Sequence, residues 1–147
     1  TPAGLSPPQP SRPPNLARHL DRDWRGARPA FCSGPPAAAR SRLRALAGSG
    51  PETADSILLY AAARPSYVVD AYTRRIFQRI GLLQGKESYD EIRRLFMQHL
   101  PEKVTLYNEY HAQIVQLAKT CCHKKSPLCR ACPLQQACLH GRQLQPS

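Results

Sequence analysis

The sequence lacks any uninterrupted apolar run of about eighteen residues, the length that a membrane-spanning helix requires. Its N-terminus also lacks the apolar core of a signal peptide, so we expect neither a membrane span nor secretion. Acidic residues are scarce as well: 10 Asp and Glu stand against 21 Lys and Arg, and none follows Glu109. The resulting formal net charge of +11 favours an anionic partner, nucleic acid first.

Proline, in contrast, is abundant, and its distribution divides the chain. Nine of the 15 prolines fall within residues 1–38, where apolar periodicity is weak, and this composition predicts a disordered segment. The segment is arginine-rich and acid-poor like an organellar transit peptide, but its prolines would break the amphipathic helix of such a peptide. We predict one domain over residues 39–140 and a short tail over residues 141–147.

Residues 39–120 carry the apolar spacing and the end signals of helices. The predicted helices span residues 39–47, residues 52–63, Ala71 up to a stop at Gly85, the capping box at Ser88 up to Leu100, and residues 102–120. Residues 67–69 form a brief apolar, strand-like stretch between two of these helices. The fold class is therefore predicted to be all-α.

A glycine hairpin, Gly48-Ser49-Gly50 followed by Pro51, joins the first two predicted helices. Glycine permits a tight turn with positive φ, and proline suits the first position of a helix. Such a hairpin can bind a phosphate, because the free N–H groups of the second helix point at the anion. The alternative is a turn that uses glycine for purely steric reasons.

Two side chains that can carry chemistry lie on the later helices. Asp70 stands where a helix is predicted to begin, and a carboxylate there caps the helix and meets the positive end of its dipole. This capping role does not exclude a catalytic one. His111 lies on the inward apolar stripe of the last long helix, where a hydrogen-bonded core histidine is favoured over a metal ligand.

Five of the six cysteines fall between Cys121 and Cys138, and four of them form the pattern C-x6-C-x2-C-x5-C. Such crowding favours a metal loop in a reducing compartment over a disulfide framework. Thiolates suit both zinc and iron–sulfur clusters, but zinc sites usually pair two separated knuckles, and only one is present here. The spacing favours a [4Fe–4S] cluster, with zinc as the alternative.

In their order, these motifs resemble the C-terminal half of the endonuclease III-like helix-hairpin-helix DNA glycosylases. The matching segments are LAGSGPETADSILLYA (46–61), VVDAYTRRIFQRIGL (68–82), LYNEYHAQIVQLAK (106–119) and the cysteine loop. The resemblance implies a partial glycosylase fold that binds double-stranded DNA, with Asp70 as the catalytic aspartate. The implied ligands of a structural [4Fe–4S] cluster are Cys122, Cys129, Cys132 and Cys138. The implied DNA contacts are Gly48, Ser49, Gly50, Glu52, Thr53, Lys119, Lys124, Lys125 and Arg130.

The sequence departs from the family pattern at two places. Bifunctional members carry a lysine two residues after the second hairpin glycine, but Glu52 stands at that position here, eighteen residues before Asp70. Because a carboxylate cannot form a Schiff base, a monofunctional glycosylase without lyase activity is implied. The helices that precede the hairpin in the family have no counterpart in residues 1–38, so we expect either a fragment or a misread N-terminal frame.

Three classes of function follow from these observations. The first is a DNA glycosylase that hydrolyses the N-glycosidic bond of a damaged or mispaired base. The second is a truncated, non-catalytic iron–sulfur module that binds DNA, and the third is a zinc-binding interaction protein. We expect a monomer without membrane association, located in the cytoplasm and, in a bacterium, at the nucleoid.

Overall fold

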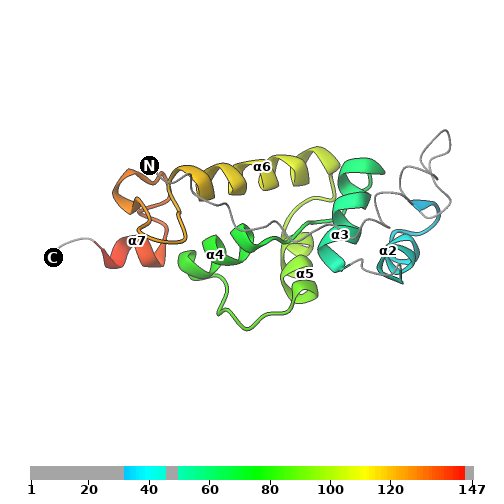
Figure 1. Ribbon diagram of the computed structural model, residues 1–147, viewed down its shortest axis with the longest axis horizontal. Coiled ribbons are helices and arrows are strands. Elements are labelled where there is room, and N and C mark those ends of the chain that lie inside the picture. Colours follow the sequence, from blue (N-terminus) through cyan, green and yellow to red (C-terminus); the bar gives the residue numbers. More distant parts are fainter. Residues whose placement is uncertain (1–31, 46–49, 145–147) are drawn as a thin grey trace, which may run out of the picture. The chain divides into compact units, whose positions relative to one another are not determined.

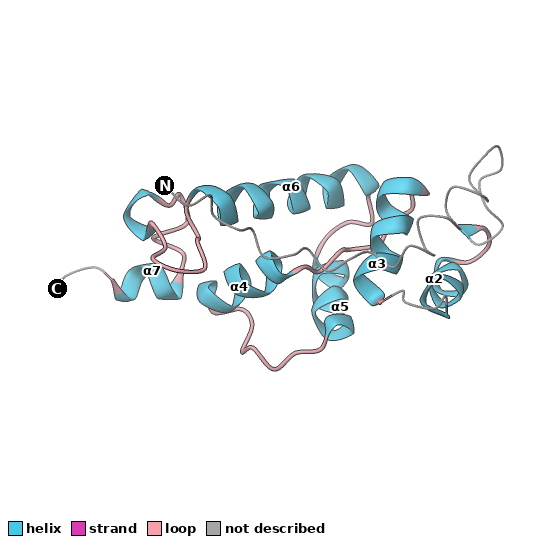
Figure 2. Ribbon diagram, in the orientation of Figure 1, coloured by secondary structure: helices cyan, strands magenta, loops and turns pink. Residues whose placement is uncertain are grey.

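The computed structural model describes residues 32–45 and 50–144, and every regular element within them is a helix (Figures 1 and 2). The helices are α2 (Pro36–Ala45), α3 (Pro51–Ser56), the π-helix η2 (Ile57–Ala61), α4 (Ala71–Ile80), α5 (Tyr89–His99), α6 (Val104–Thr120), the short 3₁₀-helix η3 (Cys129–Ala131) and α7 (Leu139–Gln143). The all-α prediction is confirmed. The chain divides into two units, residues 1–50 and residues 51–147.

In the first unit, α2 begins at Pro36, earlier than the predicted start at Ala39. Proline is well suited to this first position, because its missing N–H would have no partner within the helix. The predicted last residues of this helix lie outside the described residues, together with Gly48 and Ser49 of the hairpin. The disorder predicted for residues 1–38 is wrong at residues 36–38, which form the first turn of α2. For residues 1–31 it stays a prediction, because these residues are not described.

The second unit opens with α3, and the predicted helix over residues 52–63 changes character halfway along its length. From Ile57 onward the chain forms a π-helix, in which the Ala62 N–H donates to the Ile57 carbonyl at 3.0 Å. The wider π turn lets three successive apolar side chains, Ile57, Leu58 and Leu59, face the interior. The backbone of residue 60 is thereby also displaced from the path of a regular α-helix.

Residues 67–69, predicted to be strand-like, have no regular secondary structure, and no strand is present in the part of the chain that the structure describes. They run through the main hydrophobic core instead, where all three are buried. The Tyr67 ring stacks on Phe96 at 4.2 Å between centroids and meets the edge of Tyr107 at 5.5 Å. This buried segment delivers Asp70 to the start of α4.

Two predicted helix caps are present in the structure, and one predicted helix stop is displaced by several residues. The Asp70 cap on α4 and the capping box at Ser88 on α5 are both confirmed. The predicted stop of α4 at Gly85 is wrong, because the helix ends at Ile80 and Gly81 is its C-cap. Gly81 has φ 103° and donates to the Phe77 and Gln78 carbonyls, a left-handed closure that glycine adopts without strain.

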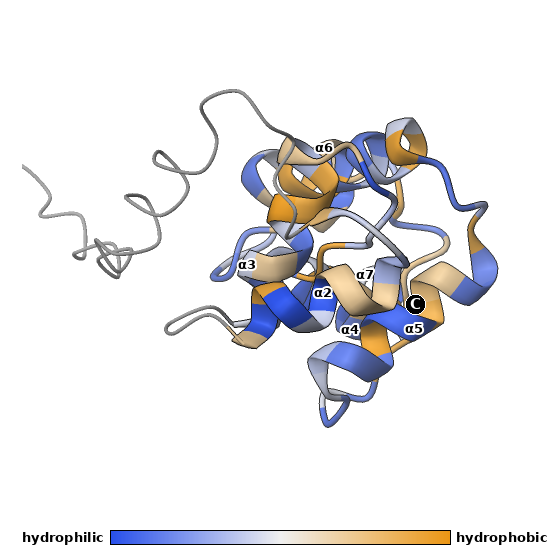
Figure 3. Cartoon of the chain, turned by 90° about the vertical axis from the view of Figure 1, so that its right-hand side faces the viewer, coloured by the Kyte–Doolittle hydropathy of each residue, from blue (hydrophilic) through white to orange (hydrophobic). Residues whose placement is uncertain are grey.

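Helix α6, with 17 residues, is the longest helix among the described residues. Figure 1 shows it running alongside α4. It contacts η2, and it also packs on α4 through a small core of Ile76, Ile114 and Ala118. Figure 3 shows hydrophobic and hydrophilic stretches following one another along α6, as expected for a helix with one buried face. None of the helices in residues 32–45 and 50–144 is long and apolar enough to cross a membrane.

Candidate active site and cysteine loop

Asp70 lies at the N-terminus of α4 with both carboxylate oxygens engaged. Oδ1 accepts hydrogen bonds from the Thr73 backbone N–H at 2.8 Å and from the Thr73 hydroxyl at 3.0 Å. Oδ2 lies 2.9 Å from Nε2 of His111, which comes from α6. Burial raises the pKa of Asp70, but the hydrogen bonds from His111 and Thr73 outweigh burial and hold the pKa below its ordinary value. Asp70 is therefore ionised at neutral pH.

His111 joins Asp70 to a third element, the π-helix η2. Its Nδ1 is hydrogen-bonded to the Tyr60 hydroxyl, and the two ring centroids lie 5.8 Å apart. Burial, and after it the charge of Asp70, raises the pKa of Tyr60. The prediction of a hydrogen-bonded histidine is thus confirmed, and its two partners are now identified.

Glu52, in the first turn of α3, belongs to the same electrostatic site. Burial raises the pKa of its carboxyl group, and the negative charge of Asp70 raises it further. His111 and Arg74 act in the opposite direction with smaller effect. The position that carries an amine in bifunctional glycosylases is therefore a carboxyl group within the field of Asp70.

Two arginines of α4 fix the beginning of the cysteine loop. Arg75 donates to the Cys122 carbonyl from Nε at 3.1 Å and from Nη2 at 2.8 Å. Arg79 donates from Nη1 to the Cys122 sulfur at 3.2 Å and to the His123 carbonyl at 2.7 Å. Its Nη2 reaches the Lys124 carbonyl at 3.0 Å. The loop is therefore held on α4 by two arginine side chains that donate to the carbonyls of three successive residues, 122–124.

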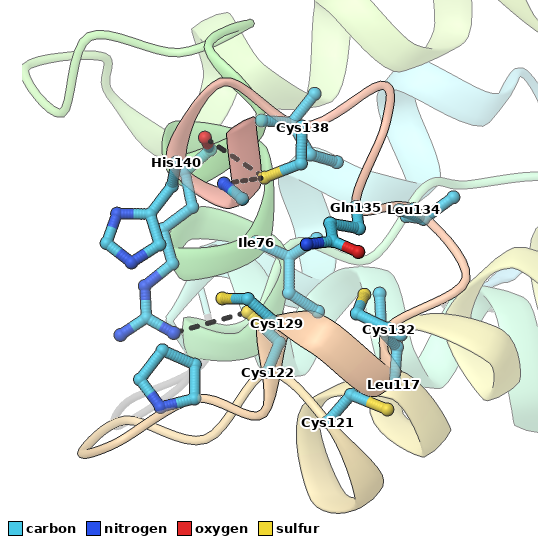
Figure 4. Close-up of a pocket in the computed structure, with 14 residues that line it drawn as sticks. Ile76, Leu117, Cys121, Cys122, Cys129, Cys132, Leu134, Gln135, Cys138 and His140 are labelled. Carbon is cyan, nitrogen blue, oxygen red and sulfur yellow. Dashed lines mark hydrogen bonds between the residues drawn. The ribbon is translucent and has the colours of Figure 1, made fainter. Parts of the chain in front are cut away.

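The four predicted ligands and Cys121 line one cavity between α4, the end of α6 and α7, which Figure 4 shows from close range. The other lining residues are mainly apolar: Ile76, Ile80, Leu117, Pro127 and Leu134 are among them. The Cys138 sulfur accepts from the Gly141 N–H at 3.5 Å, and its thiol is 3.4 Å from the Arg79 carbonyl. Burial raises the pKa of Cys132 despite a hydrogen bond from Leu134, and the neighbouring cysteines raise it further.

The cysteine arrangement can be compared with the needs of two kinds of metal site. Within residues 32–45 and 50–144, no three His, Cys, Asp or Glu side chains are placed to hold one metal ion. A zinc ion needs its sulfurs about 2.3 Å away, whereas a four-iron cluster is wider and takes thiolates from its corners. Four thiols around one apolar cavity, with Arg79 beside one sulfur, fit the wider group. Cys121 lines the same cavity, but its thiol is directed at the Ala131 carbonyl at 3.9 Å.

The predicted DNA contacts have different surroundings. The four basic residues at the end of α6 and in the cysteine loop are exposed: Lys119, Lys124, Lys125 and Arg130. Glu52 and Thr53 lie in the first turn of α3, and Gly50 is exposed just before it. Gly48 and Ser49 lie outside the described residues, so the hairpin itself stays a prediction.

Comparisons with known proteins agree with the motifs, although no family model matches the sequence. A protein of Methanocaldococcus jannaschii, provisionally named a DNA repair glycosylase, is 51% identical over 100 residues, covering 68% of this chain and 45% of that protein. Endonuclease III of Bacillus subtilis is 28% identical over 103 residues, covering 70% of this chain and 46% of that enzyme. A solved structure of endonuclease III, trapped as a covalent intermediate on DNA, is similar with a TM-score of 0.68 and 25% identity, over 87% of this chain and 55% of that one.

The chain belongs to the endonuclease III-like DNA glycosylases. It spans just under half the length of the two relatives. The endonuclease III-like resemblance read from the hairpin, Asp70 and cysteine motifs is thereby confirmed.

Sequence reasoning missed three contributions to this endonuclease III-like site: the pairing of His111 with Asp70, and the roles of Tyr60 and Thr73. The role of Thr73 was predictable from the sequence, because the side chain of a helix cap accepts from the backbone N–H three residues later. His111 is 41 residues from Asp70 in the chain, and no local pattern links them. Tyr60 reaches His111 from the π-helix, whose position depends on tertiary packing.

Proposed function

We propose that this chain provides the catalytic aspartate and part of the DNA-binding surface of a monofunctional DNA N-glycosylase acting on a damaged or mispaired base. One observation carries the proposal: the Asp70 carboxylate is ionised and held by hydrogen bonds at the start of α4, with the carboxyl group of Glu52 nearby. The partner would be double-stranded DNA, bound by a monomer.

The chemistry follows from what Asp70 can do. An enzyme of this kind extrudes the target nucleotide from the duplex before it reacts. As the bond between the base and the sugar carbon breaks, positive charge develops on the sugar, and a fixed carboxylate stabilises that charge. Water adds its oxygen to the sugar carbon and loses a proton to a base, for which Asp70 is the candidate, while the bond's electron pair leaves with the nucleobase.

The carboxyl group of Glu52 favours water, rather than a side chain of the protein, as the nucleophile. A Schiff base requires a primary amine at the sugar carbon, and a carboxyl group at that position offers none. The product would be an abasic site with an intact strand. The negative charge of Asp70 would also favour a cationic transition state over a neutral ground state.

Cys122, Cys129, Cys132 and Cys138 would hold a [4Fe–4S] cluster in this proposal, which would supply structural cross-linking of the loop. The chain's own residues then present positive charge: Lys124 and Lys125 stand exposed beside the loop segment that Arg79 holds. Lysines placed in this way bind phosphates without reading the base sequence, so affinity would depend strongly on salt.

A second candidate function is a non-catalytic iron–sulfur module that binds DNA. The observation in its favour is that the exposed lysines of the cysteine loop, Lys124 and Lys125, could bind phosphates without any part played by Asp70. The two candidates differ in one measurable property, the release of a base.

The test uses the chain as given and a chimaera in which the N-terminal helices of the M. jannaschii relative precede residues 39–147. Release of alkylated, deaminated and mispaired bases from duplex DNA is measured under single-turnover conditions. Asp70→Asn should abolish release while preserving the helix cap, because asparagine caps equally well. Asp90→Asn, at the start of α5, is the matched control and should keep full activity. Undiminished release by Asp70→Asn would refute the catalytic role, and DNA binding without release by either protein would favour the non-catalytic module.

A further inference from the structure

Three elements of the second unit meet in one line of hydrogen bonds. The Tyr60 hydroxyl from η2 contacts Nδ1 of His111 on α6, and Nε2 of the same ring lies 2.9 Å from Oδ2 of Asp70. We propose that His111 is a positioning residue for the Asp70 carboxylate and that Tyr60, placed by the π-helix, orients the His111 ring. This positioning role rests on the proposed function, because it concerns the carboxylate that would stabilise the sugar cation.

The proton positions in this line follow from the chemistry of the groups. An ionised carboxylate can only accept, so Nε2 of His111 must carry a hydrogen and donate it to Asp70. When the ring is neutral, Nδ1 accepts from the Tyr60 hydroxyl; when the ring is protonated, Nδ1 donates to the Tyr60 oxygen. Because a hydroxyl can do either, the bond from His111 to Asp70 persists in both charge states.

The position of Tyr60 gives the second, independent observation. Tyr60 lies within the π-helix and is 51% exposed, yet its hydroxyl contacts the half-buried ring of His111. A single π turn inside a helix is uncommon and occurs often at functional sites. A regular α-helical turn at Ile57–Ala61 would rotate the Tyr60 side chain to a different direction, so the π turn determines its reach.

These contacts restrict the rotation of the Asp70 carboxylate and occupy most of its hydrogen-bond positions. Of its roughly four lone-pair positions, three are taken by the Thr73 N–H, the Thr73 hydroxyl and His111. Rotation about the Cβ–Cγ bond is restricted because both carboxylate oxygens are hydrogen-bonded. One lone-pair position is left for water or for the sugar.

The titratable and charged groups that face this site from the packed elements are Glu52, Tyr60, Tyr67, Arg74 and His111. Glu52 and Tyr60 come from α3 and η2, and Arg74 comes from α4. Among these groups, only His111 bonds Oδ2 of Asp70. A carboxylate stabilised in this way is a weak base and a strong counter-charge, so we expect it to act mainly on the sugar cation.

The experiment measures Asp70 itself, independently of turnover. Side-chain carboxyl ¹³C titration by NMR is done on the full chain, purified anaerobically, for the wild type, His111→Phe and His111→Gln. His111→Phe keeps a ring but removes the donor, and the proton affinity of Asp70 should rise about tenfold, the effect of one lost charge-assisted hydrogen bond. His111→Gln should recover most of the difference, because its amide can donate from nearly the same place. The control, His99→Phe on α5, should change nothing.

A second measurement addresses Tyr60 and covers the case in which His111→Phe does not fold. In the wild type, ¹⁵N shifts of the His111 ring should show hydrogen on Nε2 and a hydrogen-bonded Nδ1. Tyr60→Phe should keep the hydrogen on Nε2, because Asp70 still accepts it, but should move the Nδ1 shift to that of a nitrogen without a hydrogen bond. Tyr110→Phe on α6 is the control. An unchanged Asp70 titration in His111→Phe, or an unchanged His111 ring spectrum in Tyr60→Phe, would overturn the proposal.

Turnover of the chimaera separates this proposal from the glycosylase function. His111→Phe should lower the single-turnover rate about tenfold and shift the acid limb of the pH profile upward, while leaving DNA affinity unchanged. His111→Gln should restore the rate and the acid limb. If even the wild type releases no base, the proposed function fails, and the NMR titrations still decide the positioning role.

Discussion

The buried ion pair between Asp55 and Arg93 allows the sharpest prediction about stability. Asp55, in α3, is completely buried, and its Oδ1 lies 3.3 Å from Nε of Arg93 on α5. The Ser66 hydroxyl donates to the same carboxylate oxygen, and Arg93 also donates to the Ser66 oxygen at 3.0 Å. These contacts tie α3, and with it Glu52, to the main core.

Replacing Arg93 with leucine removes the cation that lies 3.3 Å from the buried Asp55 carboxylate. Loss of one partner of a buried pair costs about 3–5 kcal/mol of folding free energy. For a domain of this size each kcal/mol lowers the melting temperature by roughly 4–8 °C, so Arg93→Leu should lower it by at least about 12 °C. The Arg93 side chain is only 21% exposed, so solvent screening reduces this estimate little.

The assay is thermal and urea unfolding followed by circular dichroism, with the exposed neighbour Arg94→Leu as the matched control. Arg94→Leu should change stability by no more than about 0.5 kcal/mol. The double variant Asp55→Leu with Arg93→Leu should recover most of the loss, because two apolar residues leave no buried charge. A single Arg93→Leu variant as stable as the wild type would refute the view that this pair holds α3.

Three further predictions concern the cysteine loop, the DNA surface and Asp70. Cys122→Ser should lose the visible absorption of the cluster together with its iron and sulfide, about four of each per chain, whereas Cys121→Ser should keep them. Stoichiometric zinc in the wild type would contradict the cluster assignment. Lys124→Glu with Lys125→Glu should weaken duplex binding and flatten its salt dependence, and unchanged affinity would count against the phosphate contacts. Because the folded pKa of Asp70 is lowered, its stabilisation is present above the unfolded value of about 4 and is lost as the pH falls through the folded value. Acid unfolding of Asp70→Asn should therefore show a shallower pH dependence, and an equal slope would refute the assignment.

Local signals predicted the helix caps well and helix interiors less well. Ser88 and Asp70 were identified because a cap uses a side chain and an N–H three residues apart, both visible in sequence. The stop of α4 was placed too late because Leu83 continues the apolar spacing of Ile76 and Ile80; Leu83 is indeed buried, but it lies beyond the end of the helix. Gly81, with its positive φ, fixes the end of the helix instead.

The π-helix and the hydrogen bonds of Asp70 lay beyond what sequence patterns contain. Whether residues 57–61 form α or π turns depends on how three successive apolar side chains fit a core built from distant segments. The pairing of Asp70 with His111 joins residues 41 positions apart, and sequence periodicity could place His111 only on an inward face. The cysteine pattern, in contrast, predicted one shared site, since the four cysteines line one cavity.

Trapping with borohydride tests the central claim, that water rather than the protein attacks the sugar. The chimaera and its Glu52→Lys variant are incubated with duplex DNA containing a substrate base or an abasic site, reduced, and separated by denaturing electrophoresis. A lysine at position 52 supplies the amine that a Schiff base requires, so Glu52→Lys should form a covalent complex that Asp70→Asn weakens. The protein with Glu52 should release the base, depend on Asp70 and form no covalent complex. Covalent trapping of the protein with Glu52, through any lysine, would contradict the monofunctional mechanism.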